Sequence, residues 1–202
     1  ILILKLTAEG EVFYLQERVG INNKNFKIFK IVTMVKNSPN IGSGIYTSKN
    51  DPRILPFGNF LRKTKINELI QLFNILIGDM SFVGPRPLIK RTFLLYSKEV
   101  QSIIYNIKPG LTGIGSVIFR DEESLLSKSK LSLEEFYDKN ISPYKGELEI
   151  WYQNRMSFML DIKIILITAL VLFFPKYNIN KFFKNLPTKT LLFLFVTYSL
   201  KI

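Results

Sequence analysis

The run from Ile164 to Phe174 is the sequence feature that most constrains the fold, because this apolar segment of eleven residues must be buried in a core or in a membrane. A helix needs about 20 apolar residues to cross a bilayer, and the second apolar run, Leu191 to Val196, is shorter still. The flanking residues are basic and include Arg155, Lys163, Lys176, Lys181 and Lys184. Such segments are typical of helices that lie in a membrane interface with their cations at anionic headgroups. They fit a buried helix followed by a basic tail equally well, and periodicity alone does not choose.

Charge and hydropathy point to an anionic partner. The chain carries 28 Lys and Arg against 16 Asp and Glu, a formal charge of +12, and such an excess predicts attraction to polyanions. It is also 47% apolar with 17 Phe, which favours a membrane surface. The aromatic residues fall mostly within apolar runs, whereas a nucleic-acid surface interleaves them with cations. We therefore expect membrane lipid, and no nucleic acid, as a partner.

The sequence contains no cysteine and no histidine. Disulfides, thiol nucleophiles, Ser-His-Asp triads and zinc sites built on Cys or His are therefore excluded. Any chemistry must use carboxylates, hydroxyls, Lys, Arg or a hard cation.

Short aromatic and β-branched runs predict strands over Glu11 to Gln16 and Phe26 to Met34, joined by the turn-rich Gly20 to Lys24. Lys36 to Arg53 is a long loop of a length that is usually functional or disordered. Thr64 has the character of an N-cap for a helix that runs to about Ile77.

That helix is amphipathic, with a polar stripe at Asn67, Gln71 and Asn74 and with Glu68 beside it. Further helices are expected over Leu88 to Ile107 and over Ser132 to Asn140, and Gly110 to Phe119 is expected to be a glycine-rich turn followed by a strand. The fold class is therefore α/β or α+β, a small sheet surrounded by amphipathic and interfacial helices and associated with a membrane.

Three segments combine glycine, proline and basic residues in the manner of phosphate sites. LRKTKINE (Leu61 to Glu68) gathers cations at a helix start, although Glu68 there could simply complement the helix dipole. GDMSFVGPRP (Gly78 to Pro87) holds Arg86 between two prolines, which restrict its backbone. KPGLTGIGS (Lys108 to Ser116) has glycines that permit a close backbone approach, but it is not a dinucleotide fingerprint, and there is no Walker-type loop.

Several motifs in succession resemble the bacterial sugar transferases, the monotopic phosphoglycosyl transferases. The matching segments are QERVG (16–20), FKIFKIVTM (26–34), NDPRILPFGNFLRKTKINELIQLFN (50–74), GDMSFVGPRPL (78–88), KPGLTG (108–113) and SFMLDIKI (157–164). The resemblance implies transfer of a phospho-sugar from a UDP-sugar to a polyprenyl phosphate, which initiates capsule, O-antigen or other glycan synthesis. It also implies a location at the cytoplasmic face of the bacterial inner membrane.

The chemistry of that reaction agrees with the residues available. Transfer between pyrophosphate-type esters needs positive groups and a hard cation around the phosphates, and it needs no histidine. We expect Lys30, Arg62 and Arg86 to bind phosphate. The resemblance implies an adjacent Asp-Glu pair after LRKT, with the Asp as nucleophile and the Glu assisting with Mg²⁺.

Here the pair is Asn67 and Glu68. A carboxamide is a poor nucleophile, and its presence could reduce the rate by roughly 10⁴-fold. Three outcomes are open: a nearly inactive protein, attack by another carboxylate such as Glu68 or Asp79, or direct displacement. The alternative function is accordingly an impaired family member that binds ligands or acts as a scaffold, with Glu68 still able to hold a cation.

Two other positions depart from the family pattern. Val32 replaces an arginine, and Ile70 replaces a proline, which we expect to straighten or extend the helix start. We expect residues 1–175 to form the catalytic domain, with the family's N-terminal membrane helix largely missing from the given sequence. Residues 176–202 are expected to form a basic and apolar tail of unknown role.

Overall fold

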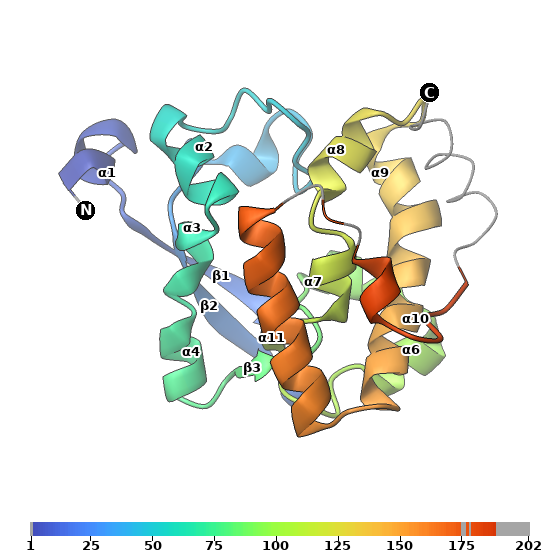
Figure 1. Ribbon diagram of the computed structural model, residues 1–202. Helices are drawn as coiled ribbons and strands as arrows, with labels where there is room; N and C mark the ends of the chain where they lie inside the picture. Colours follow the sequence, from blue (N-terminus) through green and yellow to red (C-terminus); the bar gives the residue numbers. More distant parts are fainter. Residues whose placement is uncertain (1, 175–176, 178, 189–202) are drawn as a thin grey trace.

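The computed structural model describes residues 2–174, 177 and 179–188. Two small sheets form its centre (Figure 1). In one, β1 (Phe13–Val19) pairs with β2 (Asn25–Ile31) in antiparallel fashion; in the other, β3 (Ser81–Val83) pairs with β4 (Gly110–Thr112) in parallel fashion. The mixed α/β class is thus confirmed, with two separate sheets where one was expected.

Helices surround these sheets. Along the described chain they are α1 (Leu2–Thr7), α2 (Pro56–Lys63), α3 (Ile66–Leu69), α4 (Leu72–Leu76), α5 (Lys90–Leu94), α6 (Lys98–Ile103), α7 (Ile114–Ile118), α8 (Glu122–Ser127), α9 (Leu133–Phe136), α10 (Ser142–Gln153) and α11 (Phe158–Phe173). Short 3₁₀ turns cover Ile21–Asn23, Ser38–Asn40 and Asn180–Phe182, and a π-helical turn, Tyr137–Ile141, joins α9 to α10.

The predicted hairpin is present with shifted ends. Its first strand begins later than expected and continues to Val19, whereas its second ends at Ile31 and not at Met34. Tyr14 lies opposite Lys30 and Gln16 opposite Ile28. Because side chains alternate between the two faces of a strand, Gln16 and Lys30 share one face of the hairpin.

The single helix predicted from Thr64 to Ile77 is wrong. Thr64 ends α2, and its hydroxyl donates to the carbonyl oxygen of Phe60 at 2.9 Å. Lys65 then adopts a left-handed φ of 58°, which interrupts the helical path. A second break separates α3 from α4 at Ile70, so the absence of proline there does not straighten the segment.

The polar stripe of this segment faces inward. Asn67, Gln71 and Asn74 are buried, and both α3 and α4 pack against β2. Asn74 accepts a hydrogen bond from the backbone N–H of Phe29 at 3.0 Å and donates to the carbonyl oxygen of Lys27 at 2.9 Å. The apolar side chains consequently face outward, and Leu76 is 80% exposed.

The long loop from Lys36 to Arg53 is ordered around its last residue. The buried Arg53 guanidinium pairs with Asp51 at 2.6 Å. It also donates to the backbone oxygens of Ser38 at 2.7 Å and Ile41 at 2.9 Å. Because a buried guanidinium needs this many acceptors, the loop is folded about the arginine.

Two further helical predictions are partly right. The segment from Leu88 to Ile107 forms two helices, α5 and α6, rather than one. The helix predicted over Ser132 to Asn140 is formed by α9 and the π-helical turn, and the Ser132 hydroxyl caps α9 by accepting from the N–H of Glu135 at 3.1 Å. The turn followed by a strand predicted over Gly110 to Phe119 is wrong, because the segment begins with the strand β4 and continues as the helix α7.

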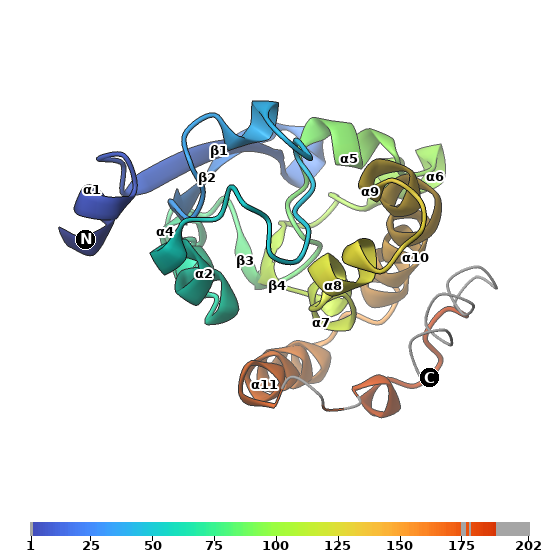
Figure 2. The ribbon, with the colours of Figure 1, turned by 90° about the horizontal axis from the view of Figure 1, so that it is seen from above.

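The main core lies between α7, α10 and α11, which Figure 2 shows on one side of the sheets. Ile114, Leu148 and Ile164 contribute one side chain from each helix, and none is exposed. Ile179 and Phe183 also belong to this core, so the described residues beyond 175 pack on the preceding domain. The proposed division at residue 175 remains a prediction.

Within the described residues, no helix has the length and apolar character needed to span a membrane. The helix α11, at 16 residues, contains the longer apolar run, in agreement with its predicted short length. The run Leu191 to Val196 lies outside the described residues.

Candidate active site

The loop after β3 meets both ends of β4 through glycines. A Cβ at Gly84 would lie 2.5 Å from the carbonyl oxygen of Lys108, and one at Gly113 would lie 2.1 Å from the carbonyl oxygen of Gly84. No other residue type fits at such distances. The glycines of the third phosphate-like segment therefore approach the Gly84 backbone, where a ligand had been expected, and they fix the loop that carries Arg86.

The backbone around Arg86 is held from several sides. The Tyr105 hydroxyl donates to the carbonyl oxygen of Arg86 at 2.8 Å and accepts from the N–H of Leu88 at 2.9 Å. Arg18 donates to the carbonyl oxygen of Pro87 at 3.1 Å. With proline on either side, the direction of the Arg86 side chain is largely determined by this loop.

Arg86 forms an ion pair with Glu68 of α3. Its two terminal nitrogens lie 2.8 and 3.4 Å from the two carboxylate oxygens. Such a bidentate, charge-assisted pair is stronger than a hydrogen bond between neutral groups. Burial alone would raise the pKa of Glu68, but the charges of Arg86 and then Lys65 hold it well below its usual range. Glu68 is therefore a carboxylate at any physiological pH.

Lys30 lies beside this pair on β2. Its ammonium donates to Gln16 at 3.3 Å, and Gln16 also accepts from Arg18 at 2.5 Å. Burial, followed by the positive charges of Arg18, Arg86 and Arg62 and opposed by Glu68, lowers the pKa of Lys30 to about 7. Burial and the charge of Arg86 likewise lower the pKa of Arg18 to about 10.

Arg62 lies at the end of α2 and is paired with Glu123. It makes no direct contact with Glu68 among the described hydrogen bonds, yet it is close enough to lower the pKa of Lys30. The structure thus brings Lys30, Arg62, Glu68 and Arg86 into one electrostatic cluster.

Asn67 precedes Glu68 on α3. Its side chain is buried, and Oδ1 has no hydrogen-bond partner among the described protein groups. A buried polar atom without a partner is costly. Asn67 is the residue directly before Glu68. Packing alone does not explain why a buried amide oxygen without a partner occurs there.

Two residues of this region were not predicted as part of the site. Arg18 belongs to the cluster. It lies two residues after Gln16 on β1 and so shares a face with it, and this spacing could have indicated its role. Glu149 of α10 is buried, and burial raises its pKa to about 8 against the opposing effects of Lys145 and of backbone N–H groups of Arg86 and Gly115. No local pattern in the sequence indicates that Glu149 reaches the Arg86 loop and the first turn of α7.

The metal-ligating side chains of this site suit a cation only if substrate phosphates also coordinate it. Glu68 is the carboxylate of the cluster, and the described residues contain no group of three or more acidic side chains that could hold a metal. Mg²⁺ commonly uses one or two carboxylates together with substrate phosphates and water. A cation held by Glu68 and by substrate phosphates fits this arrangement, whereas a site made of protein ligands alone does not.

Cations from β1, β2, α2 and the loop after β3 surround the Glu68 carboxylate, and such groups are complementary to phosphate oxygens. The family model for the bacterial sugar transferases matches residues 1–175. The chain therefore belongs to the bacterial sugar transferase family, which confirms the family assignment and the transferase class predicted from the motifs.

Several relatives are about one-third identical to this chain. A protein named uncharacterized sugar transferase EpsL from Bacillus subtilis is 34% identical over 84% of this chain and 73% of its own length. A UDP-glucose:undecaprenyl-phosphate glucose-1-phosphate transferase from Xanthomonas campestris is 36% identical over 82% of this chain. A UDP-N-acetylgalactosamine-undecaprenyl-phosphate N-acetylgalactosaminephosphotransferase from Aeromonas hydrophila is 36% identical over 69% of this chain.

The chain spans a small part of the last two relatives. The matched region is 32% of the Xanthomonas protein and 34% of the Aeromonas protein. The similarity is therefore to one portion of those longer transferases.

Proposed function

We propose that this protein transfers a sugar phosphate from a UDP-sugar to a polyprenyl phosphate. The observation that carries the proposal is the Glu68–Arg86 pair, with Lys30, Arg18 and Arg62 around it. Their positive charges complement the oxygens of a pyrophosphate. The names of the Xanthomonas and Aeromonas relatives supply the donor and acceptor classes.

In this reaction the bond between the bridging oxygen of the pyrophosphate and the sugar-bearing phosphorus breaks, and UMP leaves. A bond forms from that phosphorus to an oxygen of the lipid phosphate, either directly or after transfer through the protein. Lys30, Arg62 and Arg86 bind the phosphate oxygens and stabilise the charge that develops there. Glu68 would hold Mg²⁺ together with the phosphates, and the cation would further neutralise their charge.

We further propose that the protein lies on the cytoplasmic face of the bacterial inner membrane and initiates a surface glycan. The exposed apolar side chains of α3 and α4 support this location, since soluble monomers rarely expose large apolar patches. Leu69, Phe73 and Leu76 are 52%, 58% and 80% exposed. Glu68 lies on the same short helix as Leu69, so the site is close to the side on which a lipid phosphate would arrive.

Asn67 is expected to limit turnover, and Asn67→Asp is the direct test. The full chain in detergent is supplied with Mg²⁺, undecaprenyl phosphate and a UDP-sugar, and UMP release is measured. Because a carboxylate restores the nucleophile that the family resemblance implies, we expect the rate to rise on the order of 10²-fold or more. Chelation of Mg²⁺ should remove the activity of the variant.

Asn59→Asp is the matched control, because it adds the same charge at an exposed position of α2 and should leave the rate unchanged. Equal rates for the Asn67→Asp variant and the unaltered protein would assign the attack to another residue or to direct displacement. The absence of UMP from both proteins with every UDP-sugar would reject the transferase and favour the ligand-binding alternative.

A further inference from the structure

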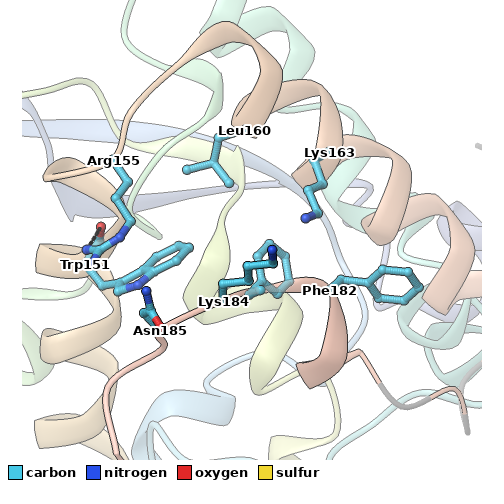
Figure 3. Close-up of a pocket in the computed structure, with 8 residues that line it drawn as sticks. Trp151, Arg155, Leu160, Lys163, Phe182, Lys184 and Asn185 are labelled. Carbon is cyan, nitrogen blue, oxygen red and sulfur yellow. Dashed lines mark hydrogen bonds between the residues drawn. The ribbon is translucent and has the colours of Figure 1, made fainter.

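A second cluster of cations lines a cavity on the other side of α11. The cavity has a volume of about 320 Å³ and lies between α10, α11 and the segment 182–185. Figure 3 shows Arg155, Lys163 and Lys184 around it, with Trp151 forming part of its wall. None of the residues that line it is acidic.

These cations have no counter-ion within the described part of the chain. No ion pair joins Arg155, Lys163 or Lys184 to a described carboxylate. Two of them lie over aromatic rings instead, with the Arg155 guanidinium 5.1 Å from the centre of the Trp151 ring and the Lys163 ammonium 5.6 Å from that of Phe183. Like charges that converge on one cavity without an anion repel one another, so the arrangement is complementary to a negative ligand.

Trp151 provides an independent observation. Its side chain is 7% exposed and lines the cavity, yet the indole N–H has no hydrogen-bond partner among the described groups. A buried Trp N–H usually finds an acceptor. Trp151, which lines the cavity, therefore carries an unsatisfied donor.

An apolar groove continues from the cationic cavity along α11. It has a volume of about 460 Å³ and is lined by Met159, Leu166 and Leu170, and it shares Lys163 and Phe182 with the first cavity. A cationic cavity that opens into an apolar groove matches a molecule with an anionic head and a hydrocarbon chain. Inorganic phosphate would match only the cationic cavity and not the apolar groove.

We propose that this composite site binds an anionic phospholipid, with its phosphate among Arg155, Lys163 and Lys184 and an acyl chain along α11. The site involves residues other than those proposed for sugar-phosphate transfer. It would hold α11 and the segment after it at the headgroup level of the bilayer.

Trp151 is the single tryptophan of the chain, so its fluorescence reports on the cavity without any need for turnover. The full chain in non-ionic detergent is titrated with phosphatidylglycerol whose acyl chains carry bromine, a quencher of tryptophan. Phosphatidylcholine with the same brominated chains is the zwitterionic comparison. We expect quenching by phosphatidylglycerol at about tenfold lower mole fraction, because each Lys or Arg near an anionic lipid contributes favourably.

The Lys163→Gln/Lys184→Gln variant should lose this preference. Both lysines are exposed, so the fold should persist, and an unchanged thermal midpoint checks that it does. Lys98→Gln/Lys128→Gln removes the same charge from exposed positions elsewhere and should retain the preference. Arg155 is left unaltered because it lies against the reporting indole.

Several results would overturn the proposal. One is equal quenching by the two lipids. Another is an equal loss of the preference for phosphatidylglycerol in both double variants, which would indicate general charge attraction. Displacement of the lipid by millimolar inorganic phosphate would assign the cavity to a free anion. If neither lipid quenches Trp151, no acyl chain lies beside it.

Discussion

Burial acts on Lys30 and Glu68 in the same direction, against the charged form, but their neighbours differ. Glu68 faces Arg86 and Lys65, so its pKa falls well below the ordinary value despite burial. Lys30 faces Arg18 and Arg86, so like charges add to burial and lower its pKa to about 7. Within the cluster, Glu68 is thus negative throughout the physiological range, whereas the charge of Lys30 depends on pH.

Donor binding should weaken as the pH rises above about 7, because phosphate oxygens favour protonated Lys30 and the free protein loses that proton near this pH. A UDP-sugar is the right ligand for the measurement, since its pyrophosphate diester does not titrate in this range. Its dissociation constant, measured by calorimetry from pH 6 to 9, should be constant below pH 7 and increase above it.

Lys30→Met should bind the donor weakly at every pH and should abolish this dependence. Lys27→Met is the control, since Lys27 lies on the same strand with an exposed side chain and should retain the wild-type profile. A pH profile that survives in Lys30→Met would assign the titration to another group.

The individual site residues were predictable to different degrees. Arg86 and Glu68 stand in short motifs whose prolines, glycines and charges indicate a phosphate site, and the structure joins them. Lys30 was predictable from the family motif, but its lowered pKa was not, because it depends on Arg18 and Arg62 from other elements. The pKa of Glu149 likewise arises from burial of α10 against elements distant in sequence, among them the Arg86 loop and α7.

At the scale of elements, the close contact between the loop after β3 and the two ends of β4 should be the most sensitive feature. Gly84→Ala would place a Cβ 2.5 Å from the carbonyl oxygen of Lys108 and 2.9 Å from the backbone nitrogen of Gly110. Because both neighbours are backbone, the loops must separate, and we expect a loss of about 2–4 kcal/mol in unfolding free energy. Denaturant unfolding measures this loss.

Gly10→Ala is an informative comparison. Gly10 has a φ of +81° with open space around its Cβ position, so the substitution adds backbone strain without crowding, at a cost of about 1–2 kcal/mol. If the Gly84 variant is no less stable than the Gly10 variant, the loops are not in tight contact.

Elements with a strong local signal were predicted best. The hairpin rests on alternating β-branched and aromatic residues, and α9 begins at a serine cap. The segment after Thr64 was mispredicted because nothing in its apolar spacing indicates the left-handed Lys65, and because its polar stripe turns inward to bond β2. The order of β4 and α7 depends on the contact between Gly113 and Gly84, which no local pattern reveals.

The exposed apolar side chains form a feature of the whole molecule. Besides those of α3 and α4, Phe158 and Phe173 at the two ends of α11 are 76% and 79% exposed. Figure 2 shows α5 on the opposite side of the molecule from α11 and separated from α4. If α4 and α11 both meet the membrane, apolar substitutions on them should act on binding and not on folding.

The test compares Leu76→Gln/Ile77→Gln with Leu94→Gln, whose leucine is an exposed residue of α5. Leu76 and Ile77 are 80% and 64% exposed in the free protein, so the thermal midpoint should barely change in either variant. Inserting a large apolar side chain into lipid contributes about 1.5–3 kcal/mol. We therefore expect at least a tenfold fall in vesicle binding, measured by co-sedimentation, for the α4 variant alone. An equal fall for Leu94→Gln would show that no particular side of the molecule meets the bilayer, and the proposed approach of the lipid phosphate to Glu68 and Arg86 would lose its support.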